Sequence, residues 1–263
     1  MTDSGASTRI PVSAVLIVKN ERNQLETTLP LLRFCDEIVV VDSGSDDGTI
    51  EFATRAGCRV IQQEFLGFGA QKAFAVNQAR NDWVLNIDAD EKVTEGLERE
   101  IREYLSKAGQ DDSGLEIPRR LVFMGTEFRH GRESRDLVLR LFRRSAGNFD
   151  QAAVHEKVRL HRGQVHRAEG ALLHESYPSL KAYVSKMNRY TSLGAEELLR
   201  KQPDRMALVY AAVFPAKFLQ FLLLHGNLLN GRAGWCWSAL SAFAFFVKHL
   251  KLHELKSRKS PLD

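Results

Sequence analysis

Residues 83–91 read WVLNIDADE, an apolar run that ends abruptly in acidic residues. The apolar part is typical of a strand buried in a parallel sheet, and ligands bind open α/β sheets just beyond the carboxyl ends of such strands. Side chains at i and i+2 of an extended segment point the same way, so Asp88 and Asp90 are expected to face one pocket. Carboxylates this close repel each other unless a cation lies between them, and oxygen ligands suit Mg²⁺, Mn²⁺ and Ca²⁺. The stretch predicts a metal–diphosphate site; the alternative is an acidic turn in which Asp90 or Thr94 caps a helix to about Lys107.

Strands and helices alternate on both sides of this stretch. Apolar runs predict strands at 12–18, 37–41 and 59–62, with helices expected over about 20–33, 49–56 and 70–80. Asn20 is a candidate cap for the first helix, which Pro30 should kink or shorten. The alternation favours βαβ units and therefore an α/β fold with a doubly wound, Rossmann-like, mostly parallel sheet over residues 10–110.

The pattern changes after a polar connection at 107–114. Short strands are expected at 116–119, 138–142 and 154–160, followed by a helix over 179–200, so this half is predicted to be α+β. We therefore expect a flexible N-terminus over 1–9, one main domain over 10–200 and a C-terminal appendage over 201–263. The main domain divides into the halves 10–110 and 111–200.

The C-terminal appendage is both basic and apolar. Residues 200–263 hold ten Lys/Arg and three Asp/Glu, a net charge of +7 against −3 for the rest. Segments 206–224 and 234–247 are apolar, and Trp235 and Trp237 begin the second. The second is too short to span a membrane, so the pattern favours a hairpin in one leaflet of an anionic membrane over two buried helices. No nucleic-acid-binding motif accompanies the charge, so no nucleic acid is expected as a partner.

Polar side chains also follow the first two predicted strands. Lys19, Asn20 and Glu21 come after the first, and Asp42 and Gly44 after the second. Because these strand ends should meet the acidic stretch at one sheet edge, Asp42 could accept hydrogen bonds from a nucleotide base or ribose, and Gly44 would let a ligand approach the backbone. The alternative is turn chemistry that serves only the loop. A P-loop and a G-x-G-x-x-G fingerprint are both missing, which argues against a P-loop NTPase and a Rossmann dehydrogenase.

Three motifs resemble the family-2 glycosyltransferases of the GT-A fold: VKNE at 18–21, IVVVDSGSDDGT at 38–49 and WVLNIDADE at 83–91. Four others narrow the resemblance to bacterial lipopolysaccharide inner-core glucosyltransferases that add β-glucose to heptose: GFGAQK at 67–72, LRLFRR at 139–144, VHEK at 154–157 and HESY at 174–177. The similarity covers about residues 10–200. It implies that a hexose is transferred with inversion from a UDP-sugar to a lipid-linked saccharide. The hexose would be glucose, and the acceptor would be heptose of the inner core.

The resemblance also implies roles for residues of the donor site. Asp42 would bind uracil, Asp88 would contact ribose or metal, and Asp90 would hold Mg²⁺ or Mn²⁺ beside the diphosphate. His174 could complete the metal sphere, as a downstream histidine does in some GT-A enzymes. Lys72, a candidate nucleotide contact, stands in a Lys-Ala pair where the family more often has Arg-Asn.

An inverting enzyme of this family needs a general base, which many members take from an acidic pair downstream of the D-x-D triplet. This chain has no obvious pair there, and Glu156 is the candidate because His155 and Lys157 flank it. The alternative is a strand residue held in a salt bridge. Arg140 and Arg143 are candidates for binding donor or acceptor phosphates, because the guanidinium fork matches phosphate geometry.

Other functions stay open at this point. A polyprenyl-phosphate glycosyltransferase would share the donor site and need no strong base. A sugar-1-phosphate nucleotidyltransferase would need a glycine-rich basic loop after the first strand, which 19–21 does not supply. A membrane-peripheral nucleotide-sugar-binding protein would keep the fold without turnover. Three widely spaced cysteines favour a reducing compartment, and hence a cytoplasmic enzyme held peripherally at the cytoplasmic leaflet of the inner membrane.

Overall fold

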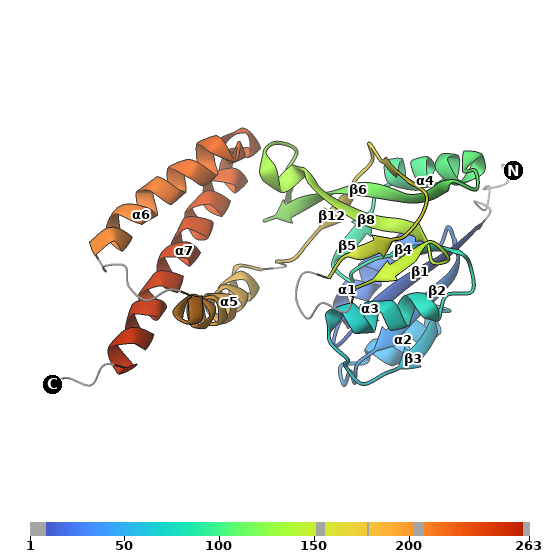
Figure 1. Cartoon of the computed structure of the whole chain (residues 1–263), viewed down its shortest axis with the longest axis horizontal. Helices are drawn as coiled ribbons and strands as arrows, with labels where there is room; N and C mark the ends of the chain where they lie inside the picture. Colours follow the sequence, from blue (N-terminus) through green and yellow to red (C-terminus); the bar gives the residue numbers. More distant parts are fainter. Residues whose placement is uncertain (1–8, 151–155, 178, 202–207, 260–263) are drawn as a thin grey trace, which may run out of the picture. The chain divides into compact units, whose positions relative to one another are not determined.

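The computed structural model describes residues 9–150, 156–177, 179–201 and 208–259. The chain forms two compact units, each with its own packing. Met1–Arg119 and Leu137–His174 make the first, called here the sheet unit; Arg120–Asp136 and Glu175–Asp263 make the second, called the helical unit. Figure 1 labels the elements of both.

The sheet unit is built on a mixed sheet with the strand order β3-β2-β1-β4-β8-β6-β12-β5. Its strands are β1 Ile10–Val18, β2 Cys35–Asp42, β3 Arg59–Gln62, β4 Trp83–Asn86, β5 Glu91–Val93, β6 Asp112–Phe123, β8 Asp136–Arg143, β11 Gln164–Arg167 and β12 Leu172–His174. Strands β1 to β4 are parallel, as the βαβ pattern predicted, whereas β8 runs antiparallel to β4. A separate hairpin pairs β9 Gly147–Phe149 with β10 Val158–Leu160.

Four α-helices accompany these strands in the described part of the unit: α1 Arg22–Thr28, α2 Thr49–Arg55, α3 Phe68–Asn77 and α4 Glu95–Lys107. Pro30 shortens the first helix as predicted, because the chain continues as a 3₁₀ turn, η1 Leu29–Leu32. Thr94 caps α4, accepting a hydrogen bond from the backbone N–H of Leu97 at 3.2 Å. The predicted cap by Asn20 is wrong, since its side chain accepts a hydrogen bond from the next loop instead.

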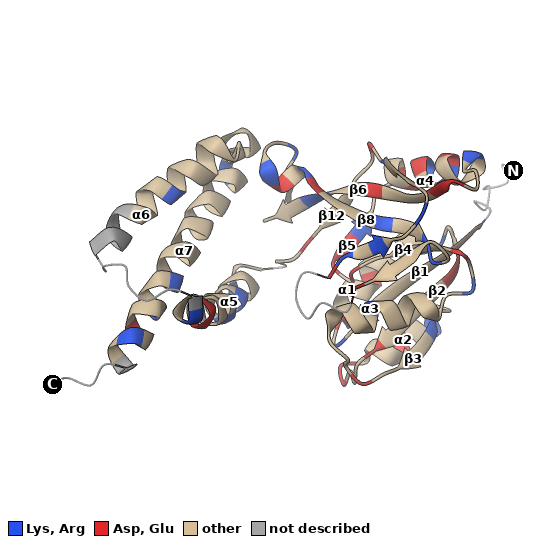
Figure 2. Cartoon of the chain, viewed as in Figure 1, with Lys and Arg blue, Asp and Glu red and all other residues tan. Residues whose placement is uncertain are grey.

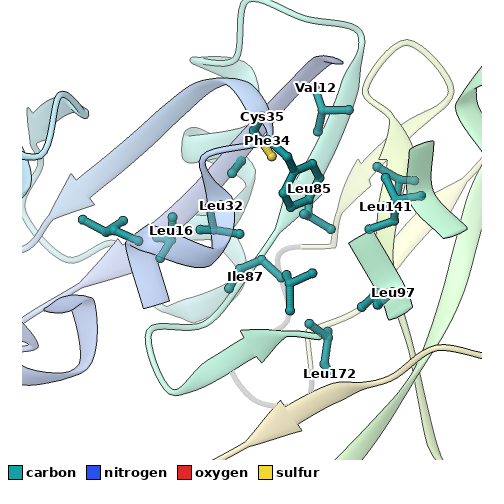
Figure 3. Close-up of a cluster of buried hydrophobic side chains, with 14 of the residues drawn as sticks. Val12, Leu16, Leu32, Phe34, Cys35, Leu85, Ile87, Leu97, Leu141 and Leu172 are labelled. Carbon is teal, nitrogen blue, oxygen red and sulfur yellow. The ribbon is translucent and has the colours of Figure 1, made fainter. Parts of the chain in front are cut away.

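An apolar core holds the parallel strands in register (Figure 3). Leu16 on β1 and Leu85 on β4 are fully buried, and Leu32, Leu97 and Leu172 belong to the same cluster. Burying a leucine side chain contributes about 1.5–3 kcal/mol relative to leaving it exposed. The core therefore fixes where each strand ends, and with it the positions of the loops that follow.

The helical unit surrounds an aromatic cluster. It contains β7 Thr126–Glu127, η2 Arg132–Ser134, α5 Leu180–Lys201, α6 Leu208–Leu219, η3 Gln220–Leu224, η4 Asn227–Asn230 and α7 Gly231–Lys259. Phe123 and Trp237 pack edge to face at 5.3 Å between ring centroids, and Tyr183 lies 5.9 Å from each. Among the helices of the described residues, none has the length and apolar character needed to cross a membrane.

Candidate active site

The loops after β1 and β2 are tied together at the carboxyl edge of the sheet. The backbone N–H of Asn20 donates to Ser45 Oγ at 2.8 Å, and Asn20 Oδ1 accepts from the backbone N–H of Asp46 at 2.9 Å. The N–H of Glu21 donates to Thr49 Oγ1 at 3.0 Å. The motifs at 18–21 and 38–49 thus form one interlocked edge, on which Lys19 is exposed.

Asp42 ends β2 fully buried, and its carboxylate is bound by its own loop. Oδ1 accepts hydrogen bonds from the backbone N–H groups of Gly44 at 2.8 Å and Ser45 at 2.9 Å, and Oδ2 accepts one from the Ser45 hydroxyl. Gly44 has a φ of +87°, which only glycine adopts without strain, and open space lies where a side chain would be. The turn chemistry that the sequence offered as an alternative is therefore present at Asp42.

Asp88 lies between two cations. Its Oδ1 is 3.0 Å from Lys72 Nζ, and its Oδ2 is 2.5 Å from Arg140 Nη2. Lys72 also contacts Glu156, at 3.0 Å between Nζ and Oε1. Figure 2 shows charged segments on β5 and β8, whereas β4 carries none. The structure therefore joins three residues that the sequence named for separate roles: Lys72, Asp88 and Glu156.

Glu91 is a further member of this ion-pair network. It is fully buried, and its Oε1 accepts from Arg140 Nη2 at 2.5 Å and Arg119 Nη1 at 3.3 Å. Its Oε2 accepts from the backbone N–H of Asp88 at 3.1 Å. Neither Glu91 nor Arg119 had a role predicted from the sequence. A usable signal was Arg140 itself, since an arginine inside an apolar strand needs a buried acidic partner.

The network keeps its members charged. Burial raises the pKa of Asp88, but the charges of Arg140 and Lys72 outweigh this effect and hold that pKa well below its usual range. Burial likewise lowers the pKa of Arg140, but the carboxylates of Asp88 and Glu91 outweigh burial and raise it. Breaking a buried pair of this kind leaves one charge uncompensated and typically costs about 3–5 kcal/mol.

Asp90 and His174 form a second, smaller pair. His174 Nε2 lies 3.3 Å from Asp90 Oδ2, because β12 pairs with β5 and carries the imidazole to the acidic turn. No three His, Cys, Asp or Glu side chains are grouped as metal ligands within the described ranges. A carboxylate and an imidazole nevertheless suit Mn²⁺ or Mg²⁺ when substrate phosphate oxygens and water complete the sphere. Asp88, also named as a ligand, has both oxygens in ion pairs.

Arg143, the second arginine predicted to bind phosphate, lies away from this network. Because β8 is antiparallel to β4, Arg143 is opposite Trp83 at the amino end of that strand, and its guanidinium lies 4.4 Å from the Trp83 ring centroid. It contacts Asp82 at 3.2 Å. Arg140, three residues earlier, donates to Asn86 Oδ1 at 2.9 Å near the acidic turn. Antiparallel pairing therefore decides which of two arginines that the sequence treated alike lies near the acidic turn.

Comparisons with known proteins agree with these features. The family model described as glycosyl transferase family 2 matches residues 13–162. The lipopolysaccharide core biosynthesis glycosyltransferase LpsC of Rhizobium meliloti (strain 1021) is 33% identical, over 97% of each chain. A glycosyltransferase of Rickettsia typhi (strain ATCC VR-144 / Wilmington) is 30% identical over 94% of this chain and 89% of that protein. The mannosyltransferase PcManGT of Pyrobaculum calidifontis, solved with GDP-Man and Mn²⁺, shares the fold with a TM-score of 0.52 at 15% identity, over 94% of this chain and 88% of that one.

Proposed function

The chain belongs to glycosyl transferase family 2, and from that premise we propose that it moves a hexose from a UDP-sugar to a saccharide acceptor with inversion at the anomeric carbon. The observation that carries the proposal is the network at the sheet edge. One lysine, Lys72, contacts both Asp88 of the acidic triplet and Glu156, so a donor carboxylate and a candidate base lie within one ion-pair chain.

Glu156 is the proposed general base. Its carboxylate takes the proton of the acceptor hydroxyl while that oxygen forms its bond to the anomeric carbon and the bond to the diphosphate breaks, so the proton ends on Glu156 and UDP leaves. Its side chain is 17% exposed, which leaves it open to a substrate hydroxyl while Lys72 holds it from the other side. A positioned base contributes about 10²–10⁴-fold to the rate.

Asp90 and His174 are the proposed ligands of a divalent ion, Mg²⁺ or Mn²⁺. Such an ion, when bound, neutralises charge on the leaving diphosphate. Asp42 and Gly44, which close the β2 loop, are proposed contacts of the nucleotide. Lys19, Asn20 and Glu21 stay proposed contacts of the nucleotide on the neighbouring loop.

The proposed donor is UDP-glucose and the proposed acceptor is a lipid-linked saccharide, heptose of the lipopolysaccharide inner core. The relative LpsC, named for lipopolysaccharide core biosynthesis and similar over 97% of this chain, supports this class of acceptor. A polyprenyl-phosphate acceptor is the alternative, and it differs in needing no strong base.

Peripheral attachment to the cytoplasmic leaflet of the inner membrane is proposed from the helical unit. Six large apolar side chains are at least 45% exposed within residues 219–235: Leu219, Leu223, Leu224, Leu228, Leu229 and Trp235. Leu224 is 82% exposed. Figure 2 shows α6 and α7 mainly uncharged, with scattered basic segments. Exposed apolar groups beside basic ones are typical of a surface that lies on anionic lipid.

Purified protein tests the proposal directly. UDP-glucose, UDP-galactose and GDP-mannose are titrated by calorimetry with and without Mn²⁺, and transfer to a core oligosaccharide ending in heptose is followed by NMR of the new anomeric proton. The expected result is tighter binding of UDP-glucose with Mn²⁺ and a β-linked product. Retention of the α-configuration, or no turnover of any donor, would contradict it.

A further inference from the structure

The helical unit contains a cavity of about 300 Å³ among α5, η3 and α7. Its lining combines aromatic rings with two lysines; those used below are Tyr177, Tyr183, Tyr190, Lys186, Phe245 and Lys248. Small-molecule sites begin at about this volume and are mostly apolar with a few placed polar groups. The cavity is therefore large enough for one sugar ring and is lined by suitable chemistry.

Three tyrosines line the cavity: Tyr177, Tyr183 and Tyr190. Tyr177 and Tyr183 lie 4.9 Å apart between ring centroids, and Trp237 packs against both. Burial and the neighbouring Tyr177 raise the pKa of Tyr183 to about 12, so its hydroxyl is a neutral donor at physiological pH. Tyr190 is 60% exposed at the rim. Rigid rings with a polar edge suit a sugar, whose C–H face is apolar and whose hydroxyls need partners.

Two lysines of the lining contribute positive charge. Lys186 Nζ lies 5.2 Å from the centroid of Tyr177, and Lys248 Nζ lies 5.0 Å from that of Phe245. The other charge near Phe245 is Lys217, at 4.8 Å. In the described part of the chain, neither Lys186 nor Lys248 has a carboxylate within 4.0 Å. Ring contacts leave most of the three N–H donors of each ammonium unused.

The electrostatics at Lys248 favour an anion. Burial lowers the pKa of Lys248; Glu197 opposes this, and the like charge of Lys217 adds to it. An anion in the cavity would relieve that repulsion. Lys251, one turn along α7, differs from Lys248 because its ammonium is hydrogen-bonded to α5. Its Nζ donates to Thr191 Oγ1 at 2.9 Å and to Ser192 Oγ at 2.8 Å.

We infer that this cavity binds an anionic sugar of the acceptor, with the ring against Tyr177 and Tyr190 and the phosphate or carboxylate on Lys186 and Lys248. This inference rests on the proposed function, because it makes the cavity a site for a part of the acceptor other than the hydroxyl that reacts. The cavity then acts on acceptor affinity and not on the chemical step.

The test uses the full chain and three soluble probes. Mannose 6-phosphate has ring and charge, mannose has the ring alone, and glycerol 3-phosphate has the charge of a lipid headgroup without a ring. We expect mannose 6-phosphate to bind most tightly by NMR titration. The double variant Lys186→Gln/Lys248→Gln should weaken it at least tenfold, since hydrogen bonds between charged groups are the strong ones. Lys181→Gln, an exposed lysine of α5 outside the cavity lining, is the matched control.

Each outcome decides the inference. Equal binding of glycerol 3-phosphate would make this a headgroup site and overturn the sugar assignment; equal loss in Lys181→Gln, or no binding of mannose 6-phosphate, would overturn the site. UDP affinity is measured in every variant and should not change, which also shows that the variants fold. Tyr190→Ala, at an exposed position, gives a second variant that should weaken mannose 6-phosphate several-fold. A chain that binds the sugar phosphate but no nucleotide sugar would refute the proposed function and leave this site standing.

Discussion

Replacing Arg140 by methionine should destabilise the protein by about 3 kcal/mol at pH 7.5. Arg140 is 5% exposed and ion-pairs with Asp88 and Glu91, both at 2.5 Å. Removing one partner of a buried pair costs about 3–5 kcal/mol. The lower end applies here, because Asp88 keeps Lys72 and Glu91 keeps Arg119.

The effect should depend on pH in a stated direction. The folded-state pKa of Asp88 is depressed, so its pairing stabilises the protein above the unfolded pKa of about 3.9, and that contribution is lost as the pH falls toward the folded value. In Arg140→Met each of the two carboxylates has one cation fewer and can take up a proton more readily. The difference in unfolding free energy between wild type and variant should therefore shrink once the pH is lowered from 7.5 through about 3.9 and further toward the folded-state pKa of Asp88.

Urea denaturation followed by circular dichroism measures both quantities. Arg159→Met is the matched control, since Arg159 is 73% exposed at its side chain and pairs with Asp150 at 3.2 Å, an exposed contact worth about 0–1 kcal/mol. A loss below 1 kcal/mol in Arg140→Met, equal to that of the control, would refute the view that a buried network holds the acidic turn in place. A loss that stayed constant as the pH fell to about 1 unit below the unfolded pKa of Asp88 would refute its electrostatic origin.

The other predictions concern the reaction, the core and the membrane. Glu156→Gln should lower kcat by about 10²–10⁴-fold and leave UDP-glucose affinity unchanged, whereas Glu64→Gln, at an exposed position, should change neither; unaltered kcat in a coupled UDP-release assay would remove Glu156 from its role. Asp90→Ala should abolish the increase in donor affinity that Mn²⁺ produces in calorimetry, and full activity of this variant in chelator would speak against a metal at this turn. Leu85→Ala should cost about 2–5 kcal/mol in urea unfolding, since the side chain is fully buried; a loss under 1 kcal/mol would mean that the site collapses around the deletion. Leu224→Ser should weaken flotation with anionic vesicles without changing donor affinity, and unchanged flotation would contradict membrane contact through this segment.

Much of the donor half follows from local patterns. The strand at 59–62 lies where the apolar run predicted it, and Thr94 caps α4 as its position before the helix indicated. Pro30 ends α1 because its ring cannot continue the helix, which is a property of one residue. Features of this kind depend on neighbouring residues along the chain, so they can be predicted from a single sequence.

The contacts of the site depend on pairings across long sequence distances. Glu91 meets Arg119 across 28 residues and Arg140 across 49 residues, and nothing local marks those partners. Arg140 rather than Arg143 lies near the acidic turn because β8 runs antiparallel to β4, a choice that the sequence pattern did not settle. The cavity with Lys186 and Lys248 likewise needs α5 and α7 to pack together before it exists.

By itself, the sequence determined the parallel strands β1 to β4 and the acidic turn at 88–90, because hydrophobic periodicity and turn chemistry act over a few residues. Only the tertiary structure decided which charges neutralise one another: Lys72 joins Asp88 to Glu156, and Arg140 joins Asp88 to Glu91. The reason is that a buried charge is stable only beside an opposite one, and the partner is chosen by the packing of strands and helices in space.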